Sequence, residues 1–164
     1  MQTASMGLRP ASAPLPRLAS VWAAARRGLE YASPLVDLAV RLLVAVVFFK
    51  SGLTKIASWD STLYLFENEY AVPFLPPELA AYLGTAAELG LPVLLVLGLG
   101  TRFAALALFV FNIVAVISYP DLGEAGLKDH QYWGLFLLVI LFHGSGRLSL
   151  DHLIHRRFQR HAAG

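Results

Sequence analysis

Cysteine is absent from this 164-residue chain, and charged residues make up only 15% of it. Without cysteine the protein cannot carry out thiol–disulfide exchange, ligate an iron–sulfur cluster through thiolates, attach a c-type haem or form a disulfide scaffold. The sequence also lacks a recognisable Ser/His/Asp set, a glycine-rich phosphate loop and a pair of catalytic carboxylates. We therefore expect no catalytic residues, no bound metal and no intrinsic cofactor.

Apolar side chains take the place of the missing charge. They make up 57% of the residues, and the mean hydropathy is +0.60, whereas about a quarter of a typical soluble domain is charged. This composition argues against a disordered chain and an ordinary soluble enzyme, and it fits a small polytopic membrane protein. The net charge is +2, but the basic residues cluster at the ends of apolar segments. Such clustering is a topology signal, so we expect no nucleic-acid partner.

Four long apolar segments succeed one another, at residues 35–56, 79–99, 103–119 and 130–147. A helix needs about 20 residues to cross a bilayer, and each segment reaches or nearly reaches that length. None alternates between apolar and polar residues with strict period two, so helices are favoured over a β-barrel. A short turn at residues 98–101 makes the second and third segments antiparallel neighbours. The predicted fold is all-α, an antiparallel bundle of four transmembrane helices; the alternative is a soluble bundle with unusually apolar helices.

These segments divide the chain into a basic tail (1–34), a four-helix membrane domain (35–150) and a second basic tail (151–164). Residues 1–16 are rich in alanine, serine and proline, and we expect them to be disordered. Between residues 17 and 32 apolar side chains recur at helical spacing, which predicts a short amphipathic helix on the membrane surface. A flexible basic tail is the alternative for that stretch.

Lysine and arginine are distributed unequally between the two sides of the predicted bundle. Four lie in the N-terminal tail, one in the second loop and four in the C-terminal tail, against Lys128, with Lys55 at the border, on the other side. The positive-inside rule predicts that both termini are cytoplasmic in a multi-pass protein of a bacterial inner membrane. The residues expected to contact the lipid surface are Arg26, Arg27, Arg102, Arg147, Arg156 and Arg157.

Several charges lie inside the apolar segments, where an ionisable group is costly and is usually paired or functional. At 100° per residue, Arg41, Gly52 and Lys55 share one face of the first helix, whereas Lys50 lies opposite and is expected to snorkel to the outer surface. Small residues let helices approach closely in lipid. The residues expected to pack helices together are Gly52, Ala80, Gly84 and Gly90, three of them on the second helix.

Glu88 is the only charge in the second segment, on the same stripe as Ala80 and Gly84. We predict that this stripe packs on the Arg41 face, so that an Arg41–Glu88 ion pair, extended by Lys55 and Asn112, forms a buried polar core. Such a pair could serve only to specify which arrangement of the packed helices is formed. Alternatively, it could bind a polar head group, a quinone carbonyl or a proton. A protonated Glu88 is a further alternative, because burial disfavours the charged form.

The histidines are weaker signals. His130 follows Asp129 and lies near Asp121 and Glu124, so a divalent metal site is conceivable there, but the spacing matches no fixed ligand pattern. His143 lies near the other end of the same segment. A neutral imidazole that is hydrogen-bonded to a neighbour is the simplest interpretation of His143.

The run from Arg41 to Lys55 resembles the first helix of DoxX-family membrane proteins, in which an arginine leads to a phenylalanine, a glycine and a terminal lysine. Similar stretches are Ala-Glu-Leu-Gly at 87–90, Gly-Leu-Gly-Thr-Arg at 98–102 and Gly-Ser-Gly-Arg-Leu-Ser-Leu-Asp at 144–151. The similarity covers residues 35–154 and implies a four-helix membrane bundle. The positions that match the family pattern are Arg41, Gly52, Lys55, Glu88, Gly90 and Arg102, while Lys50 departs from it.

The resemblance implies less about activity. Relatives include a membrane subunit of thiosulfate:quinone oxidoreductase, a subunit of a membrane-associated oxidoreductase complex and a protein needed for methylamine dehydrogenase maturation. The first hypothesis is a non-catalytic subunit or accessory factor of a redox or maturation system, in contact with quinone and a partner protein or a second copy of itself. The second is a small-molecule or ion permease that uses Glu88, Arg41 and Lys55. A lone enzyme is the third.

Overall fold

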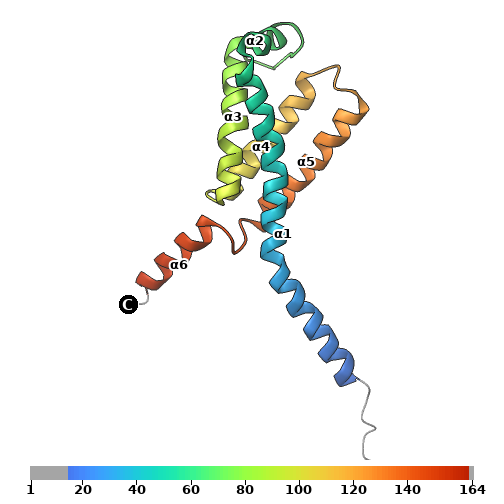
Figure 1. Ribbon diagram of the computed structural model, residues 1–164, viewed down its shortest axis with the longest axis vertical. Helices are drawn as coiled ribbons and strands as arrows, with labels where there is room; N and C mark the ends of the chain where they lie inside the picture. Colours follow the sequence, from blue (N-terminus) through green and yellow to red (C-terminus); the bar gives the residue numbers. More distant parts are fainter. Residues whose placement is uncertain (1–14, 163–164) are drawn as a thin grey trace, which may run out of the picture. The chain divides into compact units, whose positions relative to one another are not determined.

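The computed structural model describes residues 15–162, and these residues form six α-helices and no strand (Figure 1). The helices are α1 (Leu15–Ala57), α2 (Trp59–Asn68), α3 (Pro77–Leu97), α4 (Thr101–Ser118), α5 (Gly123–His143) and α6 (Leu150–Ala162). The predicted all-α class is therefore confirmed. The chain divides into two compact units, Met1–Ser33 and Pro34–Gly164, which are described separately.

In the first unit, the structure describes the N-terminal part of α1. Every described side chain from residue 18 to residue 32 is exposed, including Arg26 and Arg27. Arg26 forms an ion pair with Glu30, one turn further along the same exposed helix, at 3.4 Å. The helical conformation predicted for residues 17–32 is confirmed, and its position on a membrane surface stays a prediction.

α1 begins earlier and runs further than the sequence suggested. Disorder was expected for residues 1–16; Leu15 and Pro16 are instead helical, whereas residues 1–14 lie outside the described part of the chain. The helix also continues past Pro34, where we expected the tail to end. A proline inside a helix removes one backbone hydrogen bond, and this loss does not end α1 here.

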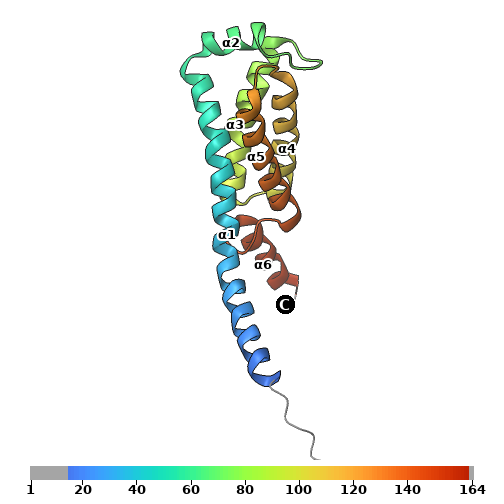
Figure 2. The same ribbon diagram turned by 90° about the vertical axis from the view of Figure 1, so that its right-hand side faces the viewer.

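In the second unit, α3, α4, α5 and the part of α1 that follows Pro34 pack side by side (Figure 2). The buried cluster between them consists of Val44, Ala45, Phe48, Leu95, Ala104, Ala105, Leu108, Leu137 and Ile140. By length and composition, three of the described helices could cross a membrane: α1 over Leu18–Ala57, α3 and α4. The first turns of α5 carry Glu124, Lys128 and Asp129, which dilute its apolar character.

The short helix α2 lies across one end of this unit (Figure 2). Phe66 of α2 packs on Ala80 and Ala81 of α3 in a small second cluster. The segment after α2 is tied to α4, because the Ala71 N–H donates to the Ser118 carbonyl at 2.8 Å. Together, α2 and this segment cover the end of the helices where the candidate site lies.

At the other end, α6 is anchored to the turn between α3 and α4. The Asp151 carboxylate accepts hydrogen bonds from the Gly100 N–H at 2.9 Å and from the Thr101 N–H and hydroxyl, each at 3.1 Å. It therefore satisfies donors at the N-terminus of α4 that have no partner within that helix. Burial alone would raise the pKa of Asp151, but these hydrogen bonds and the charge of Arg41 hold that pKa below its usual value.

Candidate functional site

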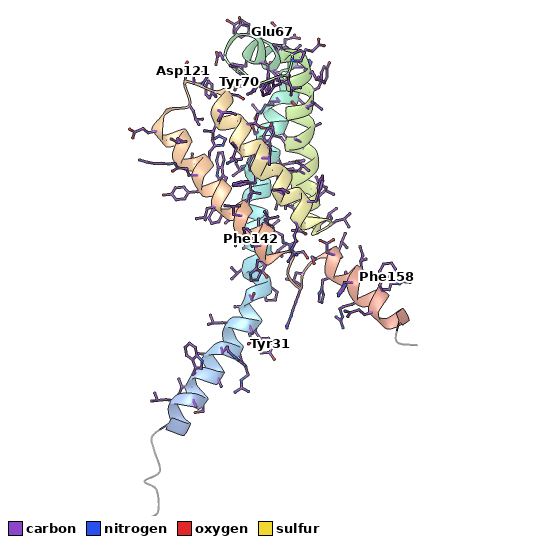
Figure 3. All side chains as sticks on the ribbon, turned by 180° about the vertical axis from the view of Figure 1, so that it is seen from behind. Tyr31, Glu67, Tyr70, Asp121, Phe142 and Phe158 are labelled. Carbon is purple, nitrogen blue, oxygen red and sulfur yellow. The ribbon has the colours of Figure 1, made fainter. Side chains whose placement is uncertain are left out.

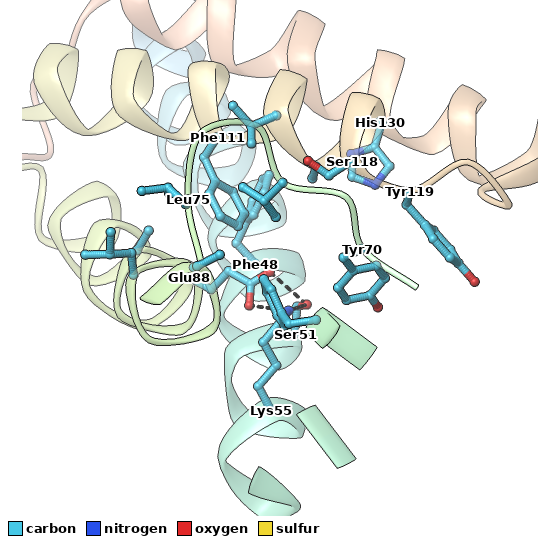
Figure 4. Close-up of a pocket in the computed structure, with 18 of the residues that line it drawn as sticks. Phe48, Ser51, Lys55, Tyr70, Leu75, Glu88, Phe111, Ser118, Tyr119 and His130 are labelled. Carbon is cyan, nitrogen blue, oxygen red and sulfur yellow. Dashed lines mark hydrogen bonds and ion pairs between the residues drawn. The ribbon is translucent and has the colours of Figure 1, made fainter. Parts of the chain in front are cut away.

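A cavity of about 520 Å³ lies beneath α2, with walls from α1, α2, α3, α4, α5 and the segment that follows α2 (Figure 4). Its walls are mainly apolar and aromatic, and include Phe48, Phe66, Leu83, Phe111, Val114 and Trp133. Pockets of about 300–1,000 Å³ with apolar walls and a few polar groups are typical of small-molecule sites. The cavity is therefore the candidate binding site.

One wall of the cavity carries three polar side chains in mutual contact. The Lys55 Nζ lies 2.6 Å from Glu88 Oε2 and donates to Ser51 Oγ at 3.0 Å. The Ser51 hydroxyl donates to Glu88 Oε1 at 3.0 Å, so both carboxylate oxygens have a partner. Glu88 is only 5% exposed, whereas Lys55 is half-buried and reaches the cavity. We call these residues the Lys55–Glu88 site.

The close approach of α1 to α3 at Gly52 brings these residues together. A Cβ atom on Gly52 would lie 2.8 Å from Leu89 Cδ2 and 3.1 Å from Glu88 Cβ, closer than packed atoms normally come. Small residues at such a crossing let two backbones approach in a membrane. Of the predicted packing of the Ala80, Gly84 and Glu88 stripe on the Arg41/Gly52 face, the structure shows the close approach of Gly52 to Glu88.

The other predicted packing residues behave differently from one another. Ala80 is buried against α2, and Gly84 faces the cavity, where a Cβ atom would have ordinary contacts with Phe66 at 3.5 Å and Phe111 at 3.7 Å. The prediction for Gly90 is wrong: this residue is exposed, and a Cβ atom there would meet nothing within 4 Å. Gly90 lies two residues beyond Glu88, which at 100° per residue turns it away from α1.

The predicted Arg41–Glu88 ion pair is wrong. Arg41 is 1% exposed, and its guanidinium donates to the backbone carbonyls of Leu95 at 3.2 Å, Asp37 at 3.4 Å and Leu148. In an antiparallel pair, a residue that lies earlier in one helix meets a residue that lies later in the other. The contact of Gly52 with α3 near Glu88 therefore places Arg41 level with the C-terminal end of α3, about 15 Å of helix from Ser51.

Asn112 was expected to extend the ion pair, and it makes a different contact. It is buried on α4 and faces α5, where its Nδ2 donates to the His130 carbonyl at 2.9 Å. Its Oδ1 lies 2.7 Å from the Nδ1 of the same histidine. The His130 ring also packs edge-on against Trp133, with centroids 4.7 Å apart, and both side chains line the cavity. Asn112 therefore positions His130, which lines the same cavity as Lys55 and Glu88.

Two tyrosines also line the cavity. The rings of Tyr70 and Tyr119 lie 5.1 Å apart, edge to face, and both residues line the cavity. Burial raises the pKa of Tyr70, and the neighbouring Tyr119 and the carboxylates of Glu69 and Glu88 raise it further. The Tyr70 phenol therefore keeps its proton at neutral pH and can donate a hydrogen bond.

Sequence reasoning missed four polar residues of the cavity: Ser51, Tyr70, Ser118 and Tyr119. Ser51 had a usable signal, because it lies one helical turn before Lys55 and so shares its face. Tyr70 and Ser118 carried no such signal, because only the packing of α2 and α4 turns them toward the cavity. The metal site considered at His130 gains no ligands: no group of three His, Cys, Asp or Glu side chains within residues 15–162 could hold a metal ion.

The basic residues assigned to the lipid surface are all exposed. In the second unit these are Arg102, Arg147, Arg156 and Arg157. On α6 the arginines accompany exposed apolar side chains, among them Phe158, which projects from the helix (Figure 3). Glu67 and Asp121 lie at the α2 end (Figure 3), so the two ends of this unit differ in charge. The lipid contacts themselves stay a prediction.

Two comparisons relate the chain to known proteins. The sequence model of the DoxX family matches residues 36–120, which include Arg41, the Lys55–Glu88 site and Asn112. An uncharacterized protein of Haemophilus influenzae is 34% identical over 128 residues, a match that covers 73% of this chain and 83% of the relative. No solved structure matches the chain.

Proposed function

We propose a function for this chain, which belongs to the DoxX family of membrane proteins. In this proposal it is a quinone-binding, non-catalytic subunit or accessory factor of a membrane redox system. The observation that carries this proposal is an apolar, aromatic cavity with an ammonium group on its wall. A quinone is a flat apolar ring whose only polar groups are carbonyl acceptors, and it reaches its sites through the bilayer.

Lys55 is suited to receive such a carbonyl. An ammonium group has three N–H donors, and the described contacts of Lys55 Nζ use two of them, to Glu88 and to Ser51. The third can donate to a ligand oxygen, and the Glu88 carboxylate balances the charge that would otherwise be costly at this depth. Electrons for quinone chemistry would come from a partner protein, because the chain has no cysteine for a thiolate-ligated redox centre.

We further propose that α5 is the fourth membrane span and that both termini are cytoplasmic. The helix has 21 residues and buries Gly134, Leu137 and Ile140 against its neighbours. The excess of arginine at the α6 end supports a cytoplasmic location for that end, so the cavity would face the outer half of the bilayer.

This topology can be measured, because the chain has no native cysteine to interfere with labelling. We expect a cysteine at Ser61 in α2 to react with a membrane-impermeant maleimide in intact cells. A cysteine at Gln159 in α6 should react only after the inner membrane is opened. Labelling of both positions in intact cells would contradict the proposal.

The function is tested by titrating decylubiquinone into purified protein in nanodiscs and following the fluorescence of Trp133, with Trp22 and Trp59 replaced by phenylalanine. We expect saturable quenching that Lys55→Met weakens by about tenfold, the loss of one charge-assisted hydrogen bond. Lys50→Met is the matched control, because Lys50 lies on the same helix but is exposed on another face. Absence of saturable quenching, or equal effects of the two lysine variants, would contradict the proposal.

A permease that uses Arg41 together with Glu88 and Lys55 has less support. A buried apolar cluster that includes Val44, Phe48 and Leu95 occupies the helix interior between Arg41 and the Lys55–Glu88 site. A conducting path would have to cross this cluster. Flux through reconstituted vesicles that Glu88→Gln abolishes would favour the permease over the quinone site.

A further inference from the structure

The hydroxyl of Ser118 is buried without a partner. Ser118 is the last residue of α4, is only 4% exposed and lines the cavity, yet its Oγ has no hydrogen bond in the described part of the chain. Buried polar groups are nearly always hydrogen-bonded, because leaving one unpaired is costly. The unpaired hydroxyl of Ser118, a residue that lines a ligand-sized cavity, is therefore available to bond a polar group of a ligand.

The hydrogen bonds of Asn112 determine which ring nitrogen of His130 carries the proton. The His130 carbonyl oxygen can only accept, so the Asn112 group facing it must be the NH₂, as observed at 2.9 Å. The amide oxygen then faces Nδ1 at 2.7 Å, and Nδ1 must carry the proton. In the neutral ring, Nε2 is left with a lone pair and accepts a hydrogen bond.

We infer that Ser118 and His130 form a second polar subsite of the cavity, which binds a ring hydroxyl of the ligand. This inference rests on the proposed quinone site and names the form that the site prefers. Nε2 can accept a hydrogen bond, and the carbonyl oxygens of an oxidised quinone have no hydrogen to donate. A hydroquinone hydroxyl donates to Nε2 of His130 and at the same time accepts from Ser118 Oγ.

The two polar walls belong to different helix pairs. Ser51, Lys55 and Glu88 come from α1 and α3, whereas Ser118 and His130 come from α4 and α5 (Figure 4). Apolar side chains such as Phe48 and Phe111, whose ring centroids lie 6.2 Å apart, line the cavity along with them. This arrangement suits a ring with one oxygen function at each end. The cavity should therefore hold the reduced, para-dihydroxy ring more tightly than the oxidised ring.

The test compares two redox forms of one ligand on the full chain in nanodiscs. Calorimetric titrations with decylubiquinol and decylubiquinone, under argon and corrected with empty nanodiscs, give the two dissociation constants. We expect the reduced form to bind about tenfold more tightly, the effect of one or two hydrogen bonds that the oxidised form cannot make. Equal affinities, or tighter binding of the oxidised form, would overturn this inference and leave the quinone proposal standing. If neither form binds, both are overturned.

Variants separate a binding role from a structural one. Ser118→Ala should lower the affinity for the reduced form about three- to tenfold without lowering the melting temperature, because the hydroxyl it removes has no partner in the protein. His130→Phe should abolish the preference between redox forms. Thr85→Val is the matched control, since Thr85 is also buried with an unpartnered hydroxyl but does not line this cavity. A Ser118→Ala variant that binds the reduced form as tightly as Thr85→Val does would contradict the subsite.

Discussion

The cationic side chains of Arg41 and Lys55 in the second unit differ in what satisfies their charge. Arg41 is enclosed by backbone carbonyls of α1, α3 and the segment before α6, and nothing else can approach it. Lys55 is half-buried, pairs with the single carboxylate of α3 and faces a cavity. Arg41 uses its N–H donors to join three parts of the chain, whereas Lys55 keeps one N–H donor available for a ligand.

The comparison shows that burial alone does not distinguish a structural charge from a binding charge. Arg41 is the more deeply buried of the two cations, and its planar guanidinium makes several directional hydrogen bonds at once. A lysine at the border of a cavity has fewer fixed partners and can exchange one for a ligand. What decides the role is whether the remaining donors face protein or open space.

The largest expected effect is at Arg41. Replacing it by methionine leaves the carbonyls of Leu95 and Leu148 without their buried donor, which should lower the free energy of unfolding by about 3 kcal/mol. Arg41→Lys should recover only part of this loss, because an ammonium group cannot reproduce the guanidinium fork. Thermal unfolding in detergent measures both. An Arg41→Met variant as stable as the parent would contradict the structural role assigned to Arg41.

The Lys55–Glu88 pair should respond differently. Glu88→Leu leaves the Lys55 charge unpaired and should cost about 2 kcal/mol, and a Lys55→Met change in the same chain should restore most of this loss. No single second change can rescue Arg41→Met in this way, because its acceptors are backbone atoms. A double-mutant cycle by thermal unfolding gives the coupling energy. If the two costs simply add, the pair is not coupled as described.

Asp151, next to the Arg41 site, should show a smaller, pH-dependent effect. Because its folded-state pKa lies below the unfolded value, its contribution to stability is complete above about pH 4 and is lost as the pH falls through the folded-state pKa. Asp151→Asn should cost about 1 kcal/mol at neutral pH and flatten the acid limb of the stability curve. The exposed Asp121→Asn is the control. A stability–pH curve unchanged by Asp151→Asn would contradict the cap.

The smallest effect concerns two glycines, one where α1 and α3 meet and one in open space on α3. Gly90→Ala, at an exposed position in α3 with open space around it, should stabilise the protein by about 0.5 kcal/mol. Gly52→Ala should do the opposite, because its Cβ would lie 2.8 Å from Leu89. Melting temperatures of the two variants check this contrast. Equal shifts would indicate that α1 and α3 do not meet at Gly52.

Sequence reasoning identified the individual polar residues better than their partners. Arg41, Glu88 and Asn112 are all buried, as expected of polar groups inside apolar segments. Their partners depend on how far one helix slides along the next. The shared helix faces led us to pair Glu88 with Arg41 and to add Lys55 only as an extension of that pair, whereas Glu88 pairs with Lys55 and Arg41 binds backbone carbonyls. The contact between Asn112 and His130 was also missed, because it joins α4 to α5 and no local sequence pattern predicts how these helices are rotated relative to each other.

The sequence by itself determined that this protein is helical and belongs in a membrane. Hydropathy and helical periodicity depend only on residues that are close in the sequence, so they can be recognised without knowledge of how the helices pack. Only the tertiary structure decided that Glu88 meets Lys55, that Arg41 binds carbonyls, and that Ser118 and His130 face one cavity. These pairings depend on the register and rotation of whole helices. The crossing at Gly52 and the anchoring of α2 and α6 determine that register, and they join residues that lie far apart in the sequence.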